Sequence, residues 1–199
     1  MLRYVRHLAR PMPGFPAGLL PAGSVAYLDI ETTGLDSTTE QLGVVGIAWA
    51  KGRGRELTQL VVEGPDDEAA VLEALRDVVT QFAGVVSYNG KAFDLPFLRG
   101  RARQLGVRWP WIETLDLLRE AWSWNRTHRV LANCRLQTVL RHFGIARHDA
   151  SGGQEVAEAY WRWVEERDER DLDLVLDHNA EDVLLMPELV PALCMRRTG

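Results

Sequence analysis

The stretch YLDIETTGL at residues 27–35 decides the fold and carries the first candidate site residues. Its β-prone residues predict a strand that enters the core, and Gly34 marks the turn that follows. Asp29 and Glu31 lie two residues apart on this strand, so their side chains point to one face of the sheet. Two neighbouring carboxylates in a buried strand are costly unless a cation compensates their charge, and hard divalent cations take oxygen ligands. The alternative is a surface strand with two solvated acids.

Strand and helix patterns continue on the C-terminal side of this stretch. LGVVGIAWA (42–50) and ELTQLVVE (56–63) predict two more strands, which short loops join into an antiparallel meander. Shorter strands are expected at 85–89 and 111–116. Helical patterns are expected from about 67 to 79, 95 to 105, 117 to 124, 134 to 144, 153 to 167 and 170 to 186, where Pro187 should end or kink the last helix. This order predicts an α/β fold with a mixed five-stranded sheet, a three-strand antiparallel meander and then parallel strands, flanked by helices.

The 199 residues fit one domain with a proper core. Residues 1–23 are rich in Pro and Gly and are expected to form an extended lead-in, so that residues 24–199 make a single domain. No apolar run approaches the length of a membrane span, and the N-terminus lacks the pattern of a signal peptide. The two cysteines, Cys134 and Cys194, are too few for a disulfide framework. A cytoplasmic location without a membrane partner is therefore expected.

Charge is distributed unevenly along the chain, although the net charge is only −5. Residues 99–147 contain ten Arg and three acids, whereas residues 155–182 contain eleven acids and three Arg. A basic segment beside a concentrated acidic one suits an enzyme that touches phosphates and also holds cations. Two solvated faces would give the same pattern, so charge alone does not decide between these interpretations.

A second motif, SYNGKAFDLPFLRGR, occupies residues 87–101. Asn89 and Gly90 supply turn chemistry after a strand, and Phe93 and Asp94 then enter a helix. Considered alone, Asp94 would be interpreted as an ordinary helix N-cap.

The third motif is LDHNAEDVLLM at residues 176–186. His178 and Asp182 are four residues apart on a predicted helix, so they share a face that also carries apolar residues and points inward. Considered alone, the two would be interpreted as a satisfied buried His–Asp pair.

Together, the three motifs resemble the DEDD 3′–5′ exonuclease superfamily. The shared pattern is an Asp-x-Glu on the first strand, an Asp at a later strand-to-helix junction and an Asp on the last helix, in this order. The residues within the motifs resemble the YprB-like ribonuclease-H-like family more closely still, and this resemblance covers roughly residues 24–190. The similar blocks are YLDIETTGL (27–35), SYNGKAFDLPFLRGR (87–101), LDLL (115–118), LANCRLQTVLRHFGIARHD (131–149) and HNAEDVLLM (178–186).

The resemblance implies a metal-dependent hydrolase that acts by a two-metal-ion mechanism. Asp29, Glu31, Asp94 and Asp182 would hold two divalent cations, Mg²⁺ or Mn²⁺, which clamp the attacking and leaving oxygens of a phosphodiester. His178 would orient or deprotonate the attacking water. The histidine branch of the superfamily usually places its His five residues before the last Asp, whereas the spacing here is four. This departure weakens the assignment of His178 as the base but not the metal set.

The resemblance also implies substrate contacts at the 3′ end of a single-stranded nucleic acid. Thr32, Thr33 and Leu35 would meet the terminal nucleotide, with further contacts from Asn89 and Phe93. Thr33 would otherwise only turn the chain, and Phe93 would otherwise be core. Aromatic and basic residues also interleave from 122 to 129, a pattern that holds single strands by stacking and by phosphate contacts.

The function expected from the sequence is a 3′–5′ exonuclease on single-stranded nucleic acid, with DNA favoured over RNA and a role in DNA repair. The alternatives are a structure-specific endonuclease on the same fold, a separate proofreading subunit, and a non-catalytic nucleic-acid-binding module. The four carboxylates do not separate exonuclease from endonuclease action, because both need the same clamp. The sequence also leaves open the physiological metal, the oligomeric state and the pathway.

Overall fold

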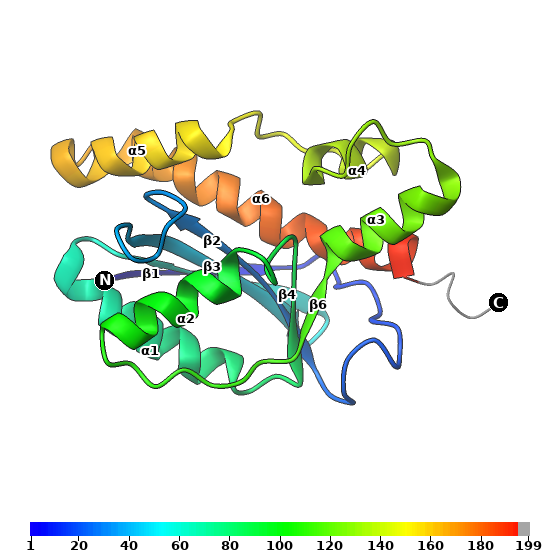
Figure 1. Ribbon diagram of the computed structural model, residues 1–199, viewed down its shortest axis with the longest axis horizontal. Coiled ribbons are helices and arrows are strands. Elements are labelled where there is room, and N and C mark those ends of the chain that lie inside the picture. The colour runs from blue at the N-terminus through cyan, green and yellow to red at the C-terminus, as the bar shows by residue number, and fades with distance from the viewer. Residues whose placement is uncertain (195–199) are drawn as a thin grey trace.

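The computed structural model describes residues 1–194, which form a six-stranded mixed sheet with helices on both faces (Figure 1). The last five residues of the expected domain 24–199 lie outside the described residues. The strands are β1 (Leu2–Leu8), β2 (Val25–Thr32), β3 (Leu42–Lys51), β4 (Gly54–Val61), β5 (Gly84–Ser87) and β6 (Thr114–Asp116). The helices are the 3₁₀ turn η1 (Pro65–Asp67), α1 (Glu68–Val79), α2 (Asp94–Gln104), α3 (Leu117–His128), α4 (Leu136–His142), α5 (Gly153–Glu166) and α6 (Glu169–Cys194).

The sheet has the predicted α/β arrangement, an antiparallel meander followed by parallel strands. The strand order is β1-β4-β3-β2-β5-β6. β2, β3 and β4 pair antiparallel, whereas β5 runs parallel to β2, and β6 runs parallel to β5. β2 therefore lies at the centre, where the meander meets the parallel strands, and the residues of its C-terminal end lie beside the segments that follow β5 and β6.

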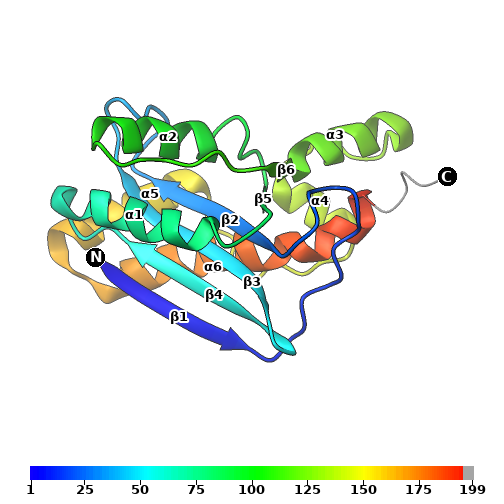
Figure 2. The same cartoon turned by 90° about the horizontal axis from the view of Figure 1, so that it is seen from below.

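The expected lead-in is partly wrong, because Leu2–Leu8 is a sixth strand rather than extended chain. β1 pairs antiparallel with β4 along its whole length and forms one edge of the sheet (Figure 2). Leu2 and Tyr4 pack against the core, whereas Arg3, Val5, Arg6 and His7 are exposed. Charged side chains are typical of edge strands, where they discourage pairing with other chains, but they weaken the strand signal in a sequence.

Helices cover the two faces of the sheet in two separate layers. α1 and α2 pack on one face, where side chains such as Ile30 of β2 and Leu72 of α1 form one apolar cluster. α3, α4, α5 and α6 lie on the other face, against side chains that include Tyr27 of β2. Residues that alternate along β2 therefore enter different layers, as the period of a strand requires.

Helix α6 continues past Pro187 and through Pro191 to Cys194, so the prediction that the helix ends at Pro187 is wrong, while a kink there stays a prediction. A proline inside a helix costs about 3 kcal/mol. The last two turns also bury Leu189, Val190 and Leu193 against the core, and each such side chain contributes about 1.5–3 kcal/mol. Packing therefore outweighs the cost of the prolines. Within residues 1–194, no helix is both long and apolar enough to cross a bilayer.

A buried ion pair fixes the loop that follows β2. Glu68, at the start of α1, is 1% exposed and accepts hydrogen bonds of 2.7 and 2.6 Å from the guanidinium of Arg101 in α2. The same carboxylate accepts the backbone N–H of Leu42, at the start of β3, and Arg101 also donates to the carbonyl oxygen of Ser37. Glu68 and Arg101 each hold one part of the loop at residues 33–41 or its end. The ion pair therefore connects α1 and α2 to the loop that follows the Asp29 and Glu31 strand.

Removing one partner of this pair should strongly destabilise the protein. Glu68→Ala leaves the Arg101 guanidinium buried without a counter-charge, which typically costs about 3–5 kcal/mol. We expect that decrease in the free energy of unfolding, measured by urea denaturation. Asp77→Ala breaks an exposed pair with Arg76 and should change stability very little. Similar losses of unfolding free energy in the two variants would show that the buried pair stabilises the protein no more than the exposed one.

Candidate active site

Asp29 and Glu31 lie at the floor of a pocket on the α6 face of the sheet. Both side chains are partly exposed, whereas Ile30 between them is buried in the opposite layer. The pocket has a volume of about 740 Å³, and His178 and Asp182 of α6 line it together with the two β2 acids. The structure therefore brings together four of the five predicted catalytic residues around one cavity.

α6 reaches β2 because the neighbouring strand carries a glycine opposite Asp29. Gly46 of β3 pairs with Asp29, and a Cβ atom at this position would collide with the side chain of Asn179. Through this gap the amide of Asn179 donates to the Asp29 carboxylate at 3.1 Å. Gln59 of β4 in turn donates to the Asn179 side-chain oxygen at 3.1 Å. Two fully buried amides, which the sequence analysis did not single out, therefore fix the orientation of Asp29.

Asp94 is the first residue of α2 and is only 3% exposed. The helix has no side-chain cap, so the interpretation of Asp94 as an ordinary N-cap is wrong. Instead its carboxylate lies close enough to Asp29 for their charges to interact. The structure thus adds the fifth predicted residue to the acids of β2.

All three acids have raised pKa values, and burial is the largest cause for each of them. Burial raises the pKa of Asp29 to about 6, although the hydrogen bond from Asn179 opposes the shift. Burial and the neighbouring Asp29 charge raise the pKa of Glu31 well above its ordinary value, and the same two causes raise the pKa of Asp94. Raised carboxylate pKa values indicate negative charge that the surrounding chain does not compensate.

Asp116 organises the turn that precedes Asp94. Its buried carboxylate accepts the backbone N–H groups of Asn89 at 2.9 Å and Lys91 at 3.1 Å, and it also caps α3 at Leu118. Asn89 has a positive φ of 69°, a conformation that Asn tolerates better than most residues. Asp116 therefore holds a turn whose Asn89 lines the pocket.

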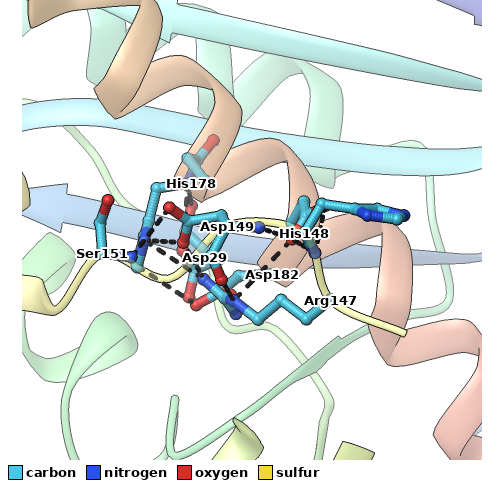
Figure 3. A network of polar contacts seen from close by, with 9 residues as sticks. Asp29, Arg147, His148, Asp149, Ser151, His178 and Asp182 are labelled. Carbon is cyan, nitrogen blue, oxygen red and sulfur yellow. Dashed lines mark hydrogen bonds and ion pairs between the residues drawn. The ribbon is translucent and has the colours of Figure 1, made fainter. Parts of the chain in front are cut away.

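A segment between α4 and α5 reaches the two α6 residues, as Figure 3 shows. Arg147 forms an ion pair with the Asp182 carboxylate, and its guanidinium also donates to Asp149 at 2.8 Å. Asp149 lies 2.6 Å from Nδ1 of His178. In the sequence, Arg147 and Asp149 are distinguished only as part of the block at 131–149, because their spacing from His178 and Asp182 does not predict a contact.

His178 and Asp149 have pKa values shifted in the direction that keeps the ring neutral and the carboxylate ionised. Burial and the Arg147 charge lower the pKa of His178. Partial burial opposes ionisation of Asp149, but hydrogen bonds from Arg147 and Ser151 outweigh it and lower the pKa of Asp149 to about 2. A neutral imidazole is the form that can accept a proton.

The chemistry of the carboxylates fits hard divalent cations, although the side chains are not arranged as a finished site. Asp29, Glu31 and Asp94 offer only oxygen atoms, the ligands that Mg²⁺ and Mn²⁺ prefer. Among residues 1–194, however, no three acid, His or Cys side chains stand in an arrangement ready to hold an ion. Asp182 instead has Arg147 as its counter-charge. Cation binding at all four acids would therefore require side-chain movement.

The predicted substrate residues fall into three groups. Asn89 lines the main pocket, whereas Leu35 and Phe93 line a separate, smaller hollow of about 300 Å³. Leu35 is 84% exposed, so its side chain is accessible to a nucleotide. The hydroxyls of Thr32 and Thr33 bond within the loop, to the Gly34 carbonyl oxygen and to Glu40.

α3 and the start of α4 form the far wall of the main pocket. Trp122 of α3 is 55% exposed there, beside Arg135. By contrast, Trp124 packs among His128, His142 and Phe143. Of the two tryptophans in the aromatic and basic segment, Trp122 faces the cavity and Trp124 belongs to the core.

A family model of the RNase H superfamily matches residues 26–194, and the chain belongs to that superfamily. Its members are generally nucleases that act on nucleic acid with divalent cations. The family B DNA polymerase of the hyperthermophilic archaeon Pyrobaculum calidifontis has a similar fold, with a TM-score of 0.65 and 19% identity. The match covers 96% of this chain but only 29% of the polymerase chain, and at this identity the likeness concerns the fold. No curated protein matches the sequence.

The raised pKa values predict a specific pH dependence of stability. In the absence of a cation, the folded state binds a proton at Asp29 more tightly than the unfolded state does. Stability from this group is fully present below the unfolded pKa of 3.8 and is lost as pH rises through about 6. The wild type should therefore lose unfolding free energy as the pH rises from 3.8 to about 6. In Asp29→Asn this loss should be smaller by an amount on the order of 2 kcal/mol.

Thermal and urea unfolding in EDTA, at a series of pH values, would measure this change. Asp36→Asn is a matched control, because Asp36 is exposed in the next loop and hydrogen bonds from Thr38 lower its pKa. Its substitution should not reduce the destabilisation at higher pH. Mg²⁺ or Mn²⁺ should stabilise the wild type at pH 8 and Asp29→Asn much less. Equal pH slopes and equal cation effects in all three proteins would contradict a cation site at Asp29.

Proposed function

We propose that this protein is a metal-dependent 3′–5′ exonuclease of the DEDD type that acts on single-stranded nucleic acid, with DNA favoured over RNA. The observation that carries the proposal is the convergence of Asp29, Glu31 and Asp94 from two distant segments, with His178 and Asp182 around the same cavity. A folded protein gains nothing in stability from three mutually repelling acids, so their placement favours a functional role. The likeness to a DNA polymerase fold supports a DNA substrate.

Asp29, Glu31, Asp94 and Asp182 are the residues that would hold two divalent cations. When bound, the cations would supply neutralisation of the charge that develops on the phosphate. Asn179 and Gln59 keep the Asp29 carboxylate aimed into the pocket. The pocket wall, with Trp122 and Arg135, would receive the terminal nucleotides.

His178 would accept the proton of the attacking water. The water oxygen forms a bond to the phosphorus between the last two nucleotides, and the bond from phosphorus to the 3′ oxygen of the penultimate nucleotide breaks. The released 3′ oxygen takes a proton from solvent, so the products are a nucleoside 5′-monophosphate and a strand one nucleotide shorter. The neutral ring that burial favours suits this role.

One observation favours a second candidate, a nucleic-acid-binding module without catalysis. Arg147 already compensates Asp182, and within residues 1–194 no ready-made group of three ligands exists. If the Arg147 pair persists in the presence of Mg²⁺ or Mn²⁺, the cavity would bind a strand but leave it intact.

A gel assay separates these functions. The wild type, with Mn²⁺ or Mg²⁺, should shorten 5′-labelled single-stranded DNA or RNA stepwise from the 3′ end. Asp29→Ala and an EDTA control should leave the strand intact, because the carboxylate or the cation is missing. A single internal cut in a branched or looped substrate would indicate an endonuclease instead. Intact strands in every lane, with cation bound and the protein folded, would favour the binding module.

Base stacking on Trp122 should contribute to binding. Stacking on an aromatic side chain contributes about 1–3 kcal/mol per base, so Trp122→Ala should raise the Kd for a single strand by about 5- to 150-fold. Fluorescence anisotropy with a labelled oligonucleotide, in an Asp29→Ala background that prevents cleavage, measures the effect. Trp111→Ala is the matched control, because Trp111 is 78% exposed but contacts Arg99 and Glu113 away from the pocket. Equal effects of the two substitutions would argue against a strand in this pocket.

A further inference from the structure

Two carboxylates stand on opposite sides of the His178 ring. Nδ1 lies 2.6 Å from Oδ2 of Asp149, whereas Nε2 lies 3.8 Å from Oδ2 of Asp182 (Figure 3). The first distance is a short hydrogen bond, and the second is too long for one. Among the described residues, Nε2 has no hydrogen-bond partner, and the ring lines the main pocket.

The short contact fixes where the ring proton lies. A carboxylate has no proton to donate, so a nitrogen 2.6 Å away must carry the proton of that hydrogen bond. In the neutral imidazole only one nitrogen is protonated, which leaves Nε2 with its lone pair. Arg147 lies 3.2 Å from Nδ1, but it donates to the Asp149 carboxylate. It therefore keeps the carboxylate in place as the acceptor of the Nδ1 proton and does not itself become the hydrogen-bond partner of Nδ1.

We propose that Asp149 is the positioning residue of His178, which holds the proton on Nδ1 and thereby presents the free Nε2 to the pocket beside Asp182. This inference rests on the proposed function only in its catalytic part. The placement of the proton concerns the protein alone. A His that must accept a proton needs its free nitrogen on the side where the water stands.

Asp149 is itself held firmly enough for this task. Its Oδ2 accepts from Arg147 at 2.8 Å, and its Oδ1 accepts the backbone N–H of Ser151 at 3.0 Å. Its own backbone N–H donates to Glu181 of α6 at 2.9 Å, so the segment is attached to the same helix that carries His178. The side chain is only 13% exposed, which limits competition from water for the hydrogen bond.

Asp149→Leu tests the placement of the proton, because Leu has a similar branched shape but no hydrogen-bond acceptor. Arg147, 3.2 Å from Nδ1, can then only donate to that nitrogen, so the ring proton should move to Nε2. ¹⁵N NMR of histidine-labelled protein in EDTA, at about pH 8 where a ring of ordinary or lowered pKa is neutral, distinguishes the two forms. His178→Gln identifies the signal among the five histidines.

Glu181→Gln is the matched control for the segment. Glu181 accepts the backbone N–H groups of His148 and Asp149, but it forms no hydrogen bond with the ring. We expect Nδ1–H in the wild type and in Glu181→Gln, and Nε2–H in Asp149→Leu. A wild-type ring with its proton on Nε2, or an Asp149→Leu ring that keeps Nδ1–H, would overturn the proposal.

The catalytic part has its own measurement. Asp149→Leu should lower kcat by about 10²-fold, within the loss of about 10²- to 10⁴-fold expected for His178→Ala, with KM and the Kd for Mn²⁺ almost unchanged. The double variant should be no slower than His178→Ala alone, because Asp149 acts through the ring. Additive losses would refute the positioning role. A wild type with Nδ1–H that cleaves no substrate would refute the proposed nuclease and the catalytic part, while the placement of the proton would stand.

Discussion

The close contact between α6 and β2 is the constraint on which the site depends. Gly46 leaves the space, Asn179 enters it, and the amide bonds directly to Asp29. An inward-facing polar helix surface would be costly if its groups lacked partners, but Gln59 and Asp29 satisfy the Asn179 side chain. The contact between Asn179 and Asp29 therefore positions a carboxylate of the sheet. It also fixes the position of the helical turn that carries His178 and Asp182 relative to the sheet.

Sequence reasoning predicted the parts of the fold that local patterns encode. The alternation in β2, the meander and the segment that enters α2 follow from periods of two and 3.6 residues, and the structure confirms them. β1 and the end of α6 were missed for opposite reasons. The strand has exposed charges, and its pairing partners lie 47 to 59 residues away along the chain. The helix contains prolines whose cost only tertiary packing offsets. Neither long-range pairing nor packing is visible in a local window.

The same limit applies to the site. Asp29, Glu31, Asp94, His178 and Asp182 lie in three recognisable motifs. The structure places four of them around one cavity, and the fifth, Asp94, lies close to Asp29. Asn179 and Gln59 are ordinary polar residues in sequence, and only the close approach at Gly46 gives them a role. Arg147 and Asp149 likewise depend on how the chain between α4 and α5 returns to α6. Motifs thus predict which residues carry chemistry, but the residues that orient them follow from the fold.

The chain compensates the two sides of the site differently, and this difference bears on where a cation would bind. On the α6 side, Arg147 balances Asp182 and Asp149. On the β2 side, burial raises the pKa values of Asp29, Glu31 and Asp94, and the Asp29 charge adds to the shift at Glu31 and Asp94. The Arg147 charge offsets the shift only in part, at Asp29. A positive charge gains most where negative charge is least compensated and most shielded from water. A cation at the β2 acids would therefore relieve repulsion that already exists, whereas one at Asp182 must first compete with a guanidinium. Under the proposed function, the β2 acids form the stronger half of the metal site, and the contribution of Asp182 depends on movement of Arg147.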